Sequence, residues 1–141
     1  MASKKDYLEH LRSVPLFSAC TTKDLQKIAK AGTEISEPAG YVIVSQGQTG
    51  REAFVLMSGQ ATVKRNNKKV ATLGPGAVIG ELSLFDHGPR TATVTADTDV
   101  TLFVIDQRHF AGIVEEVPAL AHKLLMSLAA KVREFDRQYY G

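Results

Sequence analysis

The sequence predicts a mainly β domain with helices at both ends. Residues 36–108 consist of short runs rich in β-branched residues, separated by Gly, Pro, Asn or Asp at intervals of roughly eight to twelve residues, which is typical of a roll or barrel. Residues 1–35 and 109–141 instead place apolar residues three and four positions apart, as amphipathic helices do. A chain of 141 residues can bury one core, so we expect a single domain over 1–141.

The N-terminal zone is expected to contain two helices. Pro15 ends the first helix, because the residue before a proline is pushed toward extended structure. Thr21 or Thr22 suits the N-cap of the second helix. The apolar stripes that predict the two helices are Tyr7, Leu8 and Leu11, and then Leu25, Ile28 and Ala29.

Six strands can be read individually from the middle zone: 42–44, 52–57, 60–64, 69–73, 90–96 and 100–105. Tight turns at Ser58-Gly59 and at Asn66-Asn67 are expected to close hairpins. The second turn is flanked by basic residues at 64–65 and 68–69. Because no aromatic residue interleaves with them, we interpret this run as a solvated hairpin tip rather than a nucleic-acid surface.

Two further helices are expected after the strands. The first covers roughly 109–116, and Pro118 suits the first position of the second, where its missing N–H costs nothing. The second helix carries a stripe at spacings of three and four residues: Leu124, Leu128, Val132, Phe135 and Tyr139. We expect this helix to pack on the domain, or to contact a second copy of the chain or an effector domain.

Composition argues against several classes of protein. The net charge of +2 is spread along the chain, and no apolar run approaches the ~18 residues of a membrane helix. The single cysteine, Cys20, permits no internal disulfide, favours a cytoplasmic location and is expected to be a small buried residue. No metal site is expected, because the four histidines show no ligand spacing: His10, His87, His109 and His122.

The segment GELSLFDHGPRTATV, residues 80–94, carries the chemistry of a phosphate site. The start of a short helix offers backbone N–H groups, here those of Leu82 and Ser83, and a partial positive charge to a phosphate. Arg90 can grip the same phosphate through two parallel hydrogen bonds. Glu81 would repel a phosphate, so a sugar hydroxyl is its expected partner. Phosphate and ribose recognised together predict a nucleotide ligand.

This segment resembles the phosphate-binding cassette of the cyclic nucleotide-binding domain family, which includes kinase regulatory subunits, gated channels and regulators of the catabolite-activator type. Residues 80–84 match the first half of the cassette pattern, and residues 89–92 with Val94 match the second, while Ile79 replaces a usual aromatic residue. Matches from Val14 onward extend the resemblance over nearly the whole chain. The resemblance implies an eight-stranded antiparallel β-roll (jelly roll) over 36–108, with a cassette at 79–94 that contains a short helix.

The resemblance also assigns roles to individual residues. It implies that Arg90 binds the cyclic phosphate and that Glu81 accepts a hydrogen bond from the ribose 2′-hydroxyl. A hydroxyl residue such as Thr91 can contact a guanine base in this family, although some members with a hydroxyl there respond to both nucleotides. Matching positions and a candidate lid over the base complete the implied site: Gly80, Leu82, Ser83 and Ala92, with Phe135, Tyr139 and Tyr140 as the lid. Ordinary helix packing or a dimer contact is the alternative role for the lid residues.

These features predict a regulatory module that binds a 3′,5′-cyclic nucleotide, cAMP in preference to cGMP, and whose last helix moves on binding. We expect no enzymatic activity and no further cofactor, because no placed general base or metal cluster accompanies the cassette. Nucleic-acid binding is not expected, since no helix-turn-helix follows the last helix. The alternatives are a sensor fragment of a larger channel, kinase or transcription regulator, and a scaffold domain that kept the fold and lost the ligand.

Overall fold

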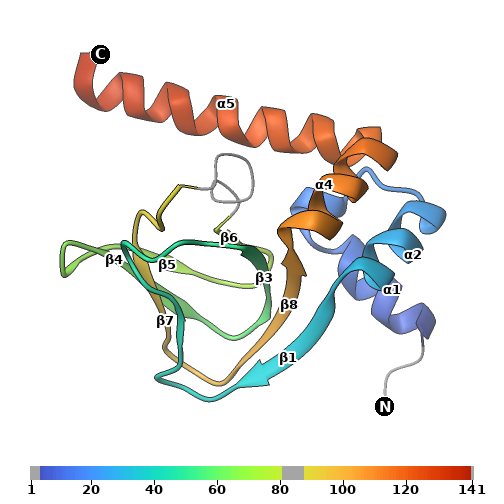
Figure 1. Ribbon diagram of the computed structural model, residues 1–141, viewed down its shortest axis with the longest axis horizontal. Coiled ribbons are helices and arrows are strands. Elements are labelled where there is room, and N and C mark those ends of the chain that lie inside the picture. Colours follow the sequence, from blue (N-terminus) through green and yellow to red (C-terminus); the bar gives the residue numbers. More distant parts are fainter. Residues whose placement is uncertain (1–3, 81–87, 141) are drawn as a thin grey trace.

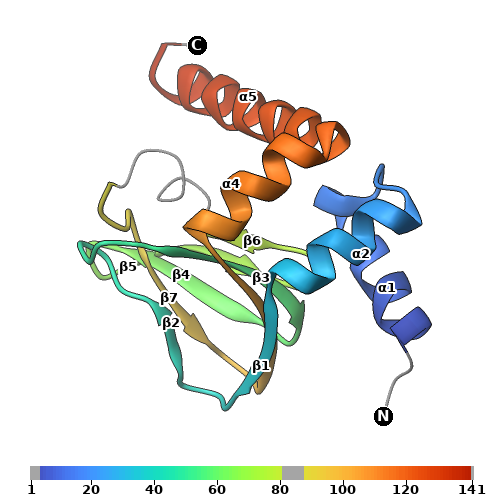
Figure 2. The same ribbon diagram turned by 45° about the vertical axis from the view of Figure 1, so that its right-hand side comes forward.

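The structure, a computed structural model, describes residues 4–80 and 88–140 (Figure 1). Within these residues, eight strands form two four-stranded antiparallel sheets in the orders β1-β8-β3-β6 and β2-β7-β4-β5 (Figures 1 and 2). The predicted antiparallel β-roll with flanking helices is confirmed. The strand bounds are β1 Thr33–Glu37, β2 Val42–Val44, β3 Glu52–Ser58, β4 Ala61–Arg65, β5 Lys68–Leu73, β6 Val78–Ile79, β7 Thr93–Ala96 and β8 Val100–Asp106.

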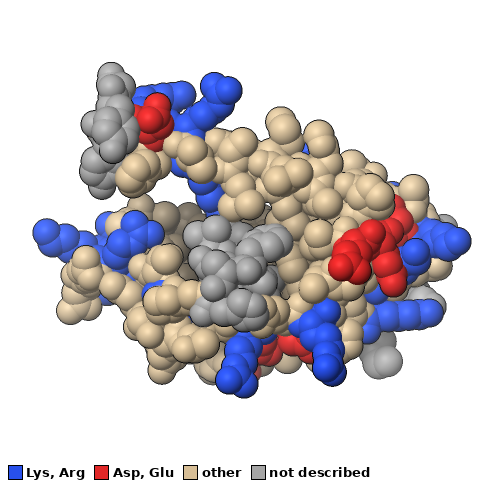
Figure 3. All heavy atoms as spheres, turned by 45° about the horizontal axis from the view of Figure 1, so that its top comes forward, with Lys and Arg blue, Asp and Glu red and all other residues tan. Residues whose placement is uncertain are grey.

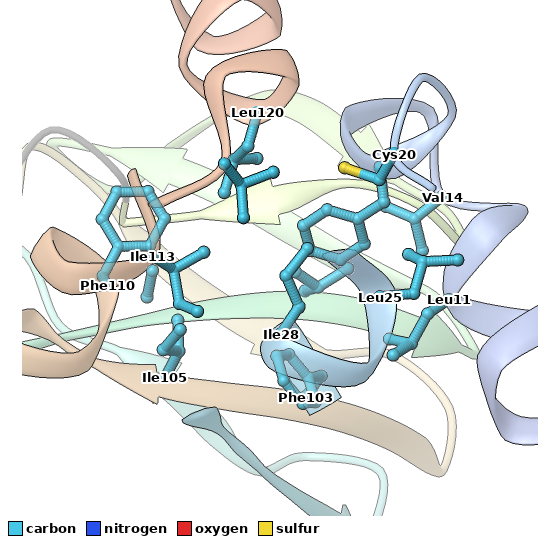
Figure 4. Packing of buried hydrophobic residues seen from close by; sticks show 14 of the residues in the cluster. Leu11, Val14, Cys20, Leu25, Ile28, Phe103, Ile105, Phe110, Ile113 and Leu120 are labelled. Atoms are coloured by element: carbon cyan, nitrogen blue, oxygen red, sulfur yellow. The ribbon is translucent and has the colours of Figure 1, made fainter. Parts of the chain in front are cut away.

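Strand β3 separates two hydrophobic cores. Ala53, Val55 and Met57 belong to a core shared with the helices, whereas Phe54 and Leu56 belong to a core shared with residues of the other sheet. Successive side chains of a strand point to opposite faces, so a strand covered on both faces is a continuous apolar run, as residues 53–57 are. Figure 4 shows the first core, where side chains from β8 meet side chains from the N-terminal and C-terminal helices.

The hairpin between β4 and β5 has the turn that the sequence predicts. Asn66 and Asn67 have φ angles of 53° and 69°, a left-handed conformation that asparagine tolerates better than most residues. The Gln46 side chain holds the turn, since its Oε1 accepts from Asn66 N and its Nε2 donates to Asn66 Oδ1, both at 2.9 Å. The basic residues at 64–65 and 68–69 are exposed, in agreement with a solvated tip.

The prediction of a hairpin at Ser58-Gly59 is wrong. Strand β3 lies in one sheet and β4 in the other, so the tight turn carries the chain between sheets. Gly59 has a φ of 89°, and a Cβ there would lie 2.8 Å from the Thr98 hydroxyl oxygen. The local turn residues were correctly identified, but β4 pairs with β5 and with β7, and not with β3.

Three short elements precede the roll: α1 (Lys4–Arg12), the 3-10 helix η1 (Pro15–Phe17) and α2 (Thr22–Ala31). Thr21 is the N-cap of α2, in a reciprocal capping box with Asp24. Cys20 is buried as expected. The helical zone ends earlier than predicted, because β1 already begins at Thr33 and pairs with β8.

Two helices follow the roll: α4 (Gln107–Glu116), capped by the Asp106 side chain, and α5 (Pro118–Tyr140). Pro118 occupies the first position of α5, as predicted. Figure 1 shows α5 crossing above the roll, with its C-terminal end over the side that carries β4 and β5. No helix in the described part of the chain is both long and apolar enough to cross a membrane.

The predicted stripe on α5 is only partly buried. Leu124 is 5% exposed and Leu128 is half-buried, but Val132 is 66% and Phe135 is 55% exposed. The N-terminal half of α5 packs against η1 and α4, whereas the C-terminal half extends beyond that core. The spacing predicted the helix correctly, but it did not predict how far along the helix the covering core extends.

Candidate functional site

Arg90 is the one buried charged side chain among the described residues, with 9% of its surface exposed. Its Nη2 donates to the Glu52 carbonyl oxygen at 2.8 Å, and its Nη1 donates to the Gly80 carbonyl oxygen at 3.3 Å. The guanidinium also lies 6.0 Å from the centre of the Phe54 ring, within cation–π range. The side chain is therefore held in one orientation by backbone groups of β3 and of the residue after β6.

The backbone around Arg90 is pinned to the loop between β2 and β3. Arg90 N donates to the Gln48 carbonyl oxygen, and Gly47 N donates to the Arg90 carbonyl oxygen, both at 2.8 Å. A single bridge between Thr49 and Pro89 continues this contact. Residues 90–92 are consequently irregular, and β7 begins at Thr93 rather than at Arg90 as predicted.

Two glycines make room for the guanidinium. Gly80 has a φ of 84°, and a Cβ added there would collide with Arg90 Nη1. A Cβ on Gly50 would lie 2.5 Å from Arg90 Cζ. Because any larger residue would have to displace the guanidinium, these two positions require glycine for the present placement of Arg90.

The charge of Arg90 is incompletely compensated within the described residues. Burial lowers the pKa of Arg90 from its ordinary value, and the nearby Glu52 carboxylate opposes this effect. Arginine nevertheless stays protonated in proteins. Its hydrogen-bond acceptors in the described part of the chain are carbonyl oxygens, which carry only partial charges. Such a cation favours an anionic ligand in the adjacent space.

That space is a pocket of about 290 Å³, close to the lower end of the roughly 300–1,000 Å³ typical of small-molecule sites. It combines apolar walls from the two sheets with three cations. The described residues that line it are Val44, Val63, Arg65, Leu73, Val78, Ile79, Gly80, Arg90, Thr91, Ala92, Val94 and Lys131. The pocket can therefore accept a ligand with an apolar, flat part and a negative group.

The sequence-predicted site residues fall into three groups. Gly80, Arg90, Thr91 and Ala92 come together in the pocket. Predicted ligand contacts at 81–83 and the short helix predicted near them lie outside the described residues, so Glu81, Leu82 and Ser83 remain predictions. Of the candidate lid residues, Phe135 is exposed and is not among the lining residues, and the side chains of Tyr139 and Tyr140 lie outside the described ones.

Sequence reasoning missed two cations at the pocket. Arg65 donates from Nε to the Thr91 carbonyl oxygen at 3.1 Å, and Lys131 reaches the pocket from α5. A signal for Lys131 existed, because it follows the buried Leu124 by seven residues and so lies on the same helix face. No comparable signal marked Arg65, which looked like one more charge on an exposed tip.

The part of the chain that the structure describes contains no candidate metal site. No group of three His, Cys, Asp or Glu residues in it could hold an ion. The described lining residues of the pocket likewise include no carboxylate and no imidazole.

Comparisons with known proteins agree with this geometry. The family model of the cyclic nucleotide-binding domain matches residues 34–117, which is more than half of the chain. The cyclic AMP receptor protein of Thermus thermophilus is 28% identical over 131 residues, covering 89% of this chain and 61% of the relative. A cAMP-dependent protein kinase regulatory subunit of Hypocrea atroviridis is 28% identical over 136 residues, covering 96% of this chain and 29% of the relative.

A solved structure leads to the same family. The Thermus thermophilus catabolite activator protein superposes with a TM-score of 0.83 and 29% identity, covering 88% of this chain and 61% of that protein. The chain thus spans less than two thirds of the length of these relatives, which are regulatory proteins by name. On the matched model, the β-roll and the arginine-lined pocket, this chain belongs to the cyclic nucleotide-binding domain family.

Proposed function

We propose that this domain is a sensor that binds a 3′,5′-cyclic nucleotide, cAMP in preference to cGMP, and that it catalyses no reaction. The observation that carries the proposal is Arg90, a buried guanidinium that faces a pocket and has only carbonyl acceptors among the described residues. A cyclic phosphate diester carries one negative charge and two free oxygens, which suit a planar guanidinium.

The remaining proposed contacts to the phosphate and the ribose come from residues 81–83 and from Ala92. The cyclic phosphate lies between Arg90 and the backbone N–H groups of Leu82 and Ser83, and Glu81 accepts a hydrogen bond from the ribose 2′-hydroxyl. Ala92 is buried and small, so it leaves space beside the phosphate. The Gly80 carbonyl oxygen accepts a hydrogen bond from Arg90 Nη1, so the residue that precedes the proposed contacts at 81–83 already lies beside Arg90.

The base occupies the apolar part of the pocket. Val63 and Leu73 of the β4–β5 hairpin provide apolar contacts against which either purine base can pack. Thr91 is exposed at the pocket and offers one hydroxyl, which is compatible with guanine without requiring it. The Thermus receptor protein and the kinase regulatory subunit are named for cyclic AMP and support the preference for cAMP, whereas a similar cGMP-dependent protein kinase is named for cyclic GMP.

Helix α5 is the output element in this proposal. Its C-terminal half is largely exposed, so its position depends on few packing contacts and can change at modest cost. Lys131 lines the pocket from this half of the helix. A ligand in the pocket can therefore contact α5 directly, and a contact that differs between two positions of the helix shifts their populations. The recipient of this signal is a second copy of the chain or an effector domain, and we place the protein in the cytoplasm.

Calorimetric titration of the chain with cAMP and with cGMP tests the proposal. We expect saturable binding of both, with the smaller dissociation constant for cAMP. Incubation of each nucleotide with the protein, followed by chromatography, should return the nucleotide unchanged. Failure of both nucleotides to bind would favour the alternative of a scaffold domain that lost its ligand, and conversion of either would make the protein an enzyme.

A further inference from the structure

Arg65 lies on the wall of the pocket against which the base is proposed to pack. It is the last residue of β4, and it lines the pocket together with Val63 of the same strand. Alternate residues of a strand share a face, so the two residues stand side by side, roughly 6–7 Å apart along β4. Figure 3 shows basic side chains beside the hollow between α5 and the roll. A base that packs on Val63 therefore has Arg65 within reach.

The guanidinium of Arg65 is anchored along one edge. Its Nε donates to the Thr91 carbonyl oxygen at 3.1 Å, and the adjoining Asn66 is held by two hydrogen bonds to Gln46. The N–H groups of a guanidinium lie in its plane, so this anchor restricts the plane without occupying either of its faces. Because the side chain is exposed, a ligand in the pocket can cover one of those faces.

The described lining of the pocket contains no aromatic side chain. Its apolar members are aliphatic, and the candidate lid residue Phe135 is not among them. Proteins bind nucleic-acid bases by stacking them on aromatic rings or on the planes of arginine side chains. Of the two arginines in the described lining, Arg90 is proposed to bind the phosphate, whereas Arg65 lies next to Val63. Arg65 is thus the planar group on the side of the base.

We propose that Arg65 stacks its guanidinium on the purine base of the bound nucleotide; this inference rests on the proposed function. Stacking uses the π face that adenine and guanine share, so Arg65 should strengthen the binding of both nucleotides to a similar extent. From the usual range of cation–π contacts, removal of the guanidinium should raise each dissociation constant about 2- to 30-fold.

Competition titrations with three ligands test the stacking. Two are cAMP and cGMP, and the third is methyl riboside 3′,5′-cyclic phosphate, which keeps the phosphate and the sugar but has no base. The test variants are Arg65→Gln and Arg65→Lys, the second of which keeps the charge without a planar group. Lys64→Gln is the matched control, because Lys64 is an exposed cation of the same strand that does not line the pocket.

We expect Arg65→Gln to weaken cAMP and cGMP binding by similar factors and to leave binding of the ligand without a base unchanged. Arg65→Lys should recover little of the loss, and Lys64→Gln should bind like the parent. An equal loss for the ligand without a base would mean that Arg65 acts on the phosphate or through Thr91. A loss confined to cGMP would mean that Arg65 binds the edge of guanine. Either result, or unchanged affinity for cAMP, would overturn the stacking.

Nuclear magnetic resonance gives a second readout that needs only cAMP. The Nε–H signal of Arg65, assigned by its absence from Arg65→Lys, should move upfield when cAMP saturates the parent, because protons over the face of an aromatic ring are shielded. A saturated parent without this shift would refute the stacking and leave nucleotide binding intact. A parent that bound no cyclic nucleotide would refute the proposed function, and the stacking with it.

Discussion

Replacing Arg90 by alanine should nearly abolish nucleotide binding while leaving the domain folded. The substitution removes the buried guanidinium that faces the pocket. Truncating one partner of a buried, hydrogen-bonded charge pair costs about 2–5 kcal/mol of binding free energy. Since every ~1.4 kcal/mol is a factor of ten, the dissociation constant should rise about 30- to 4,000-fold.

The effect on the ligand-free protein should be much smaller, because two contributions oppose one another. Alanine loses the hydrogen bonds to the carbonyl oxygens of Glu52 and Gly80, which stabilise the fold. It also removes a charge that is poorly solvated, as the lowered pKa of Arg90 indicates. We therefore expect a change of about 1 kcal/mol or less, or about 3–5 °C in the unfolding midpoint of a domain of this size.

Thermal unfolding with and without nucleotide measures both quantities. A ligand at 100 times its dissociation constant stabilises the parent by about 2.7 kcal/mol, which is a shift of roughly 8–13 °C. At the same concentration, the Arg90→Ala variant should gain about 0.9 kcal/mol or less, which is a shift below about 5 °C. Arg51→Ala is the matched control, because Arg51 is an exposed arginine that does not line the pocket. A full ligand-induced shift in Arg90→Ala would refute the assignment of the phosphate to Arg90.

Four further predictions concern separate parts of the molecule. Gly80→Ala should weaken binding and lower stability by at least about 1–2 kcal/mol, because its φ of 84° is left-handed and the new Cβ would displace Arg90; calorimetry that finds the affinity of the parent would contradict this. Thr91→Ala should reduce cGMP affinity more than cAMP affinity in competition titrations, whereas equal losses would make Thr91 a packing residue. Asp106→Ala should cost about 0.5–2 kcal/mol of unfolding free energy in urea titrations at pH 7, since Asp106 caps α4. The backbone N–H of His109 lowers the pKa of Asp106, so its contribution is present above the ordinary carboxyl pKa and is lost as the pH falls through the lowered value; Asp106→Asn should keep the cap and lose this acid dependence. Nucleotide should slow amide hydrogen exchange in α5 as well as in residues 80–93, and protection restricted to 80–93 would refute the output role of α5.

Local signals in the sequence were sufficient for much of the fold. Six β-branched runs, the Asn66-Asn67 turn, the Thr21 cap and Pro118 at the start of α5 were all identified, because each depends on residues within a few positions of one another. The two remaining strands were not read individually. Strand β6 has two residues, too few to show a period, and β1 lies in a zone interpreted as helical until Ile35.

The residues of the candidate site also differ in whether a local signal in the sequence could predict them. Gly80, Arg90, Thr91 and Ala92 were predicted together because they belong to one short segment that resembles the family cassette, and the structure brings them to one pocket. Arg65 is 26 residues away from Thr91 in the chain, and its role depends on a hydrogen bond across the roll. Lys131 reaches the pocket only because α4 and η1 set the direction of α5.

By itself, the sequence determined the type of most elements and the family of the domain, because backbone propensity and a short motif are local properties. Only the tertiary structure decided that Gly59 leads from one sheet to the other, and that the stripe of α5 is buried at Leu124 and exposed at Phe135. It also decided that three cations from distant segments share one pocket. Each of these outcomes depends on which surfaces meet, and the meeting of surfaces is set by the packing of the whole chain.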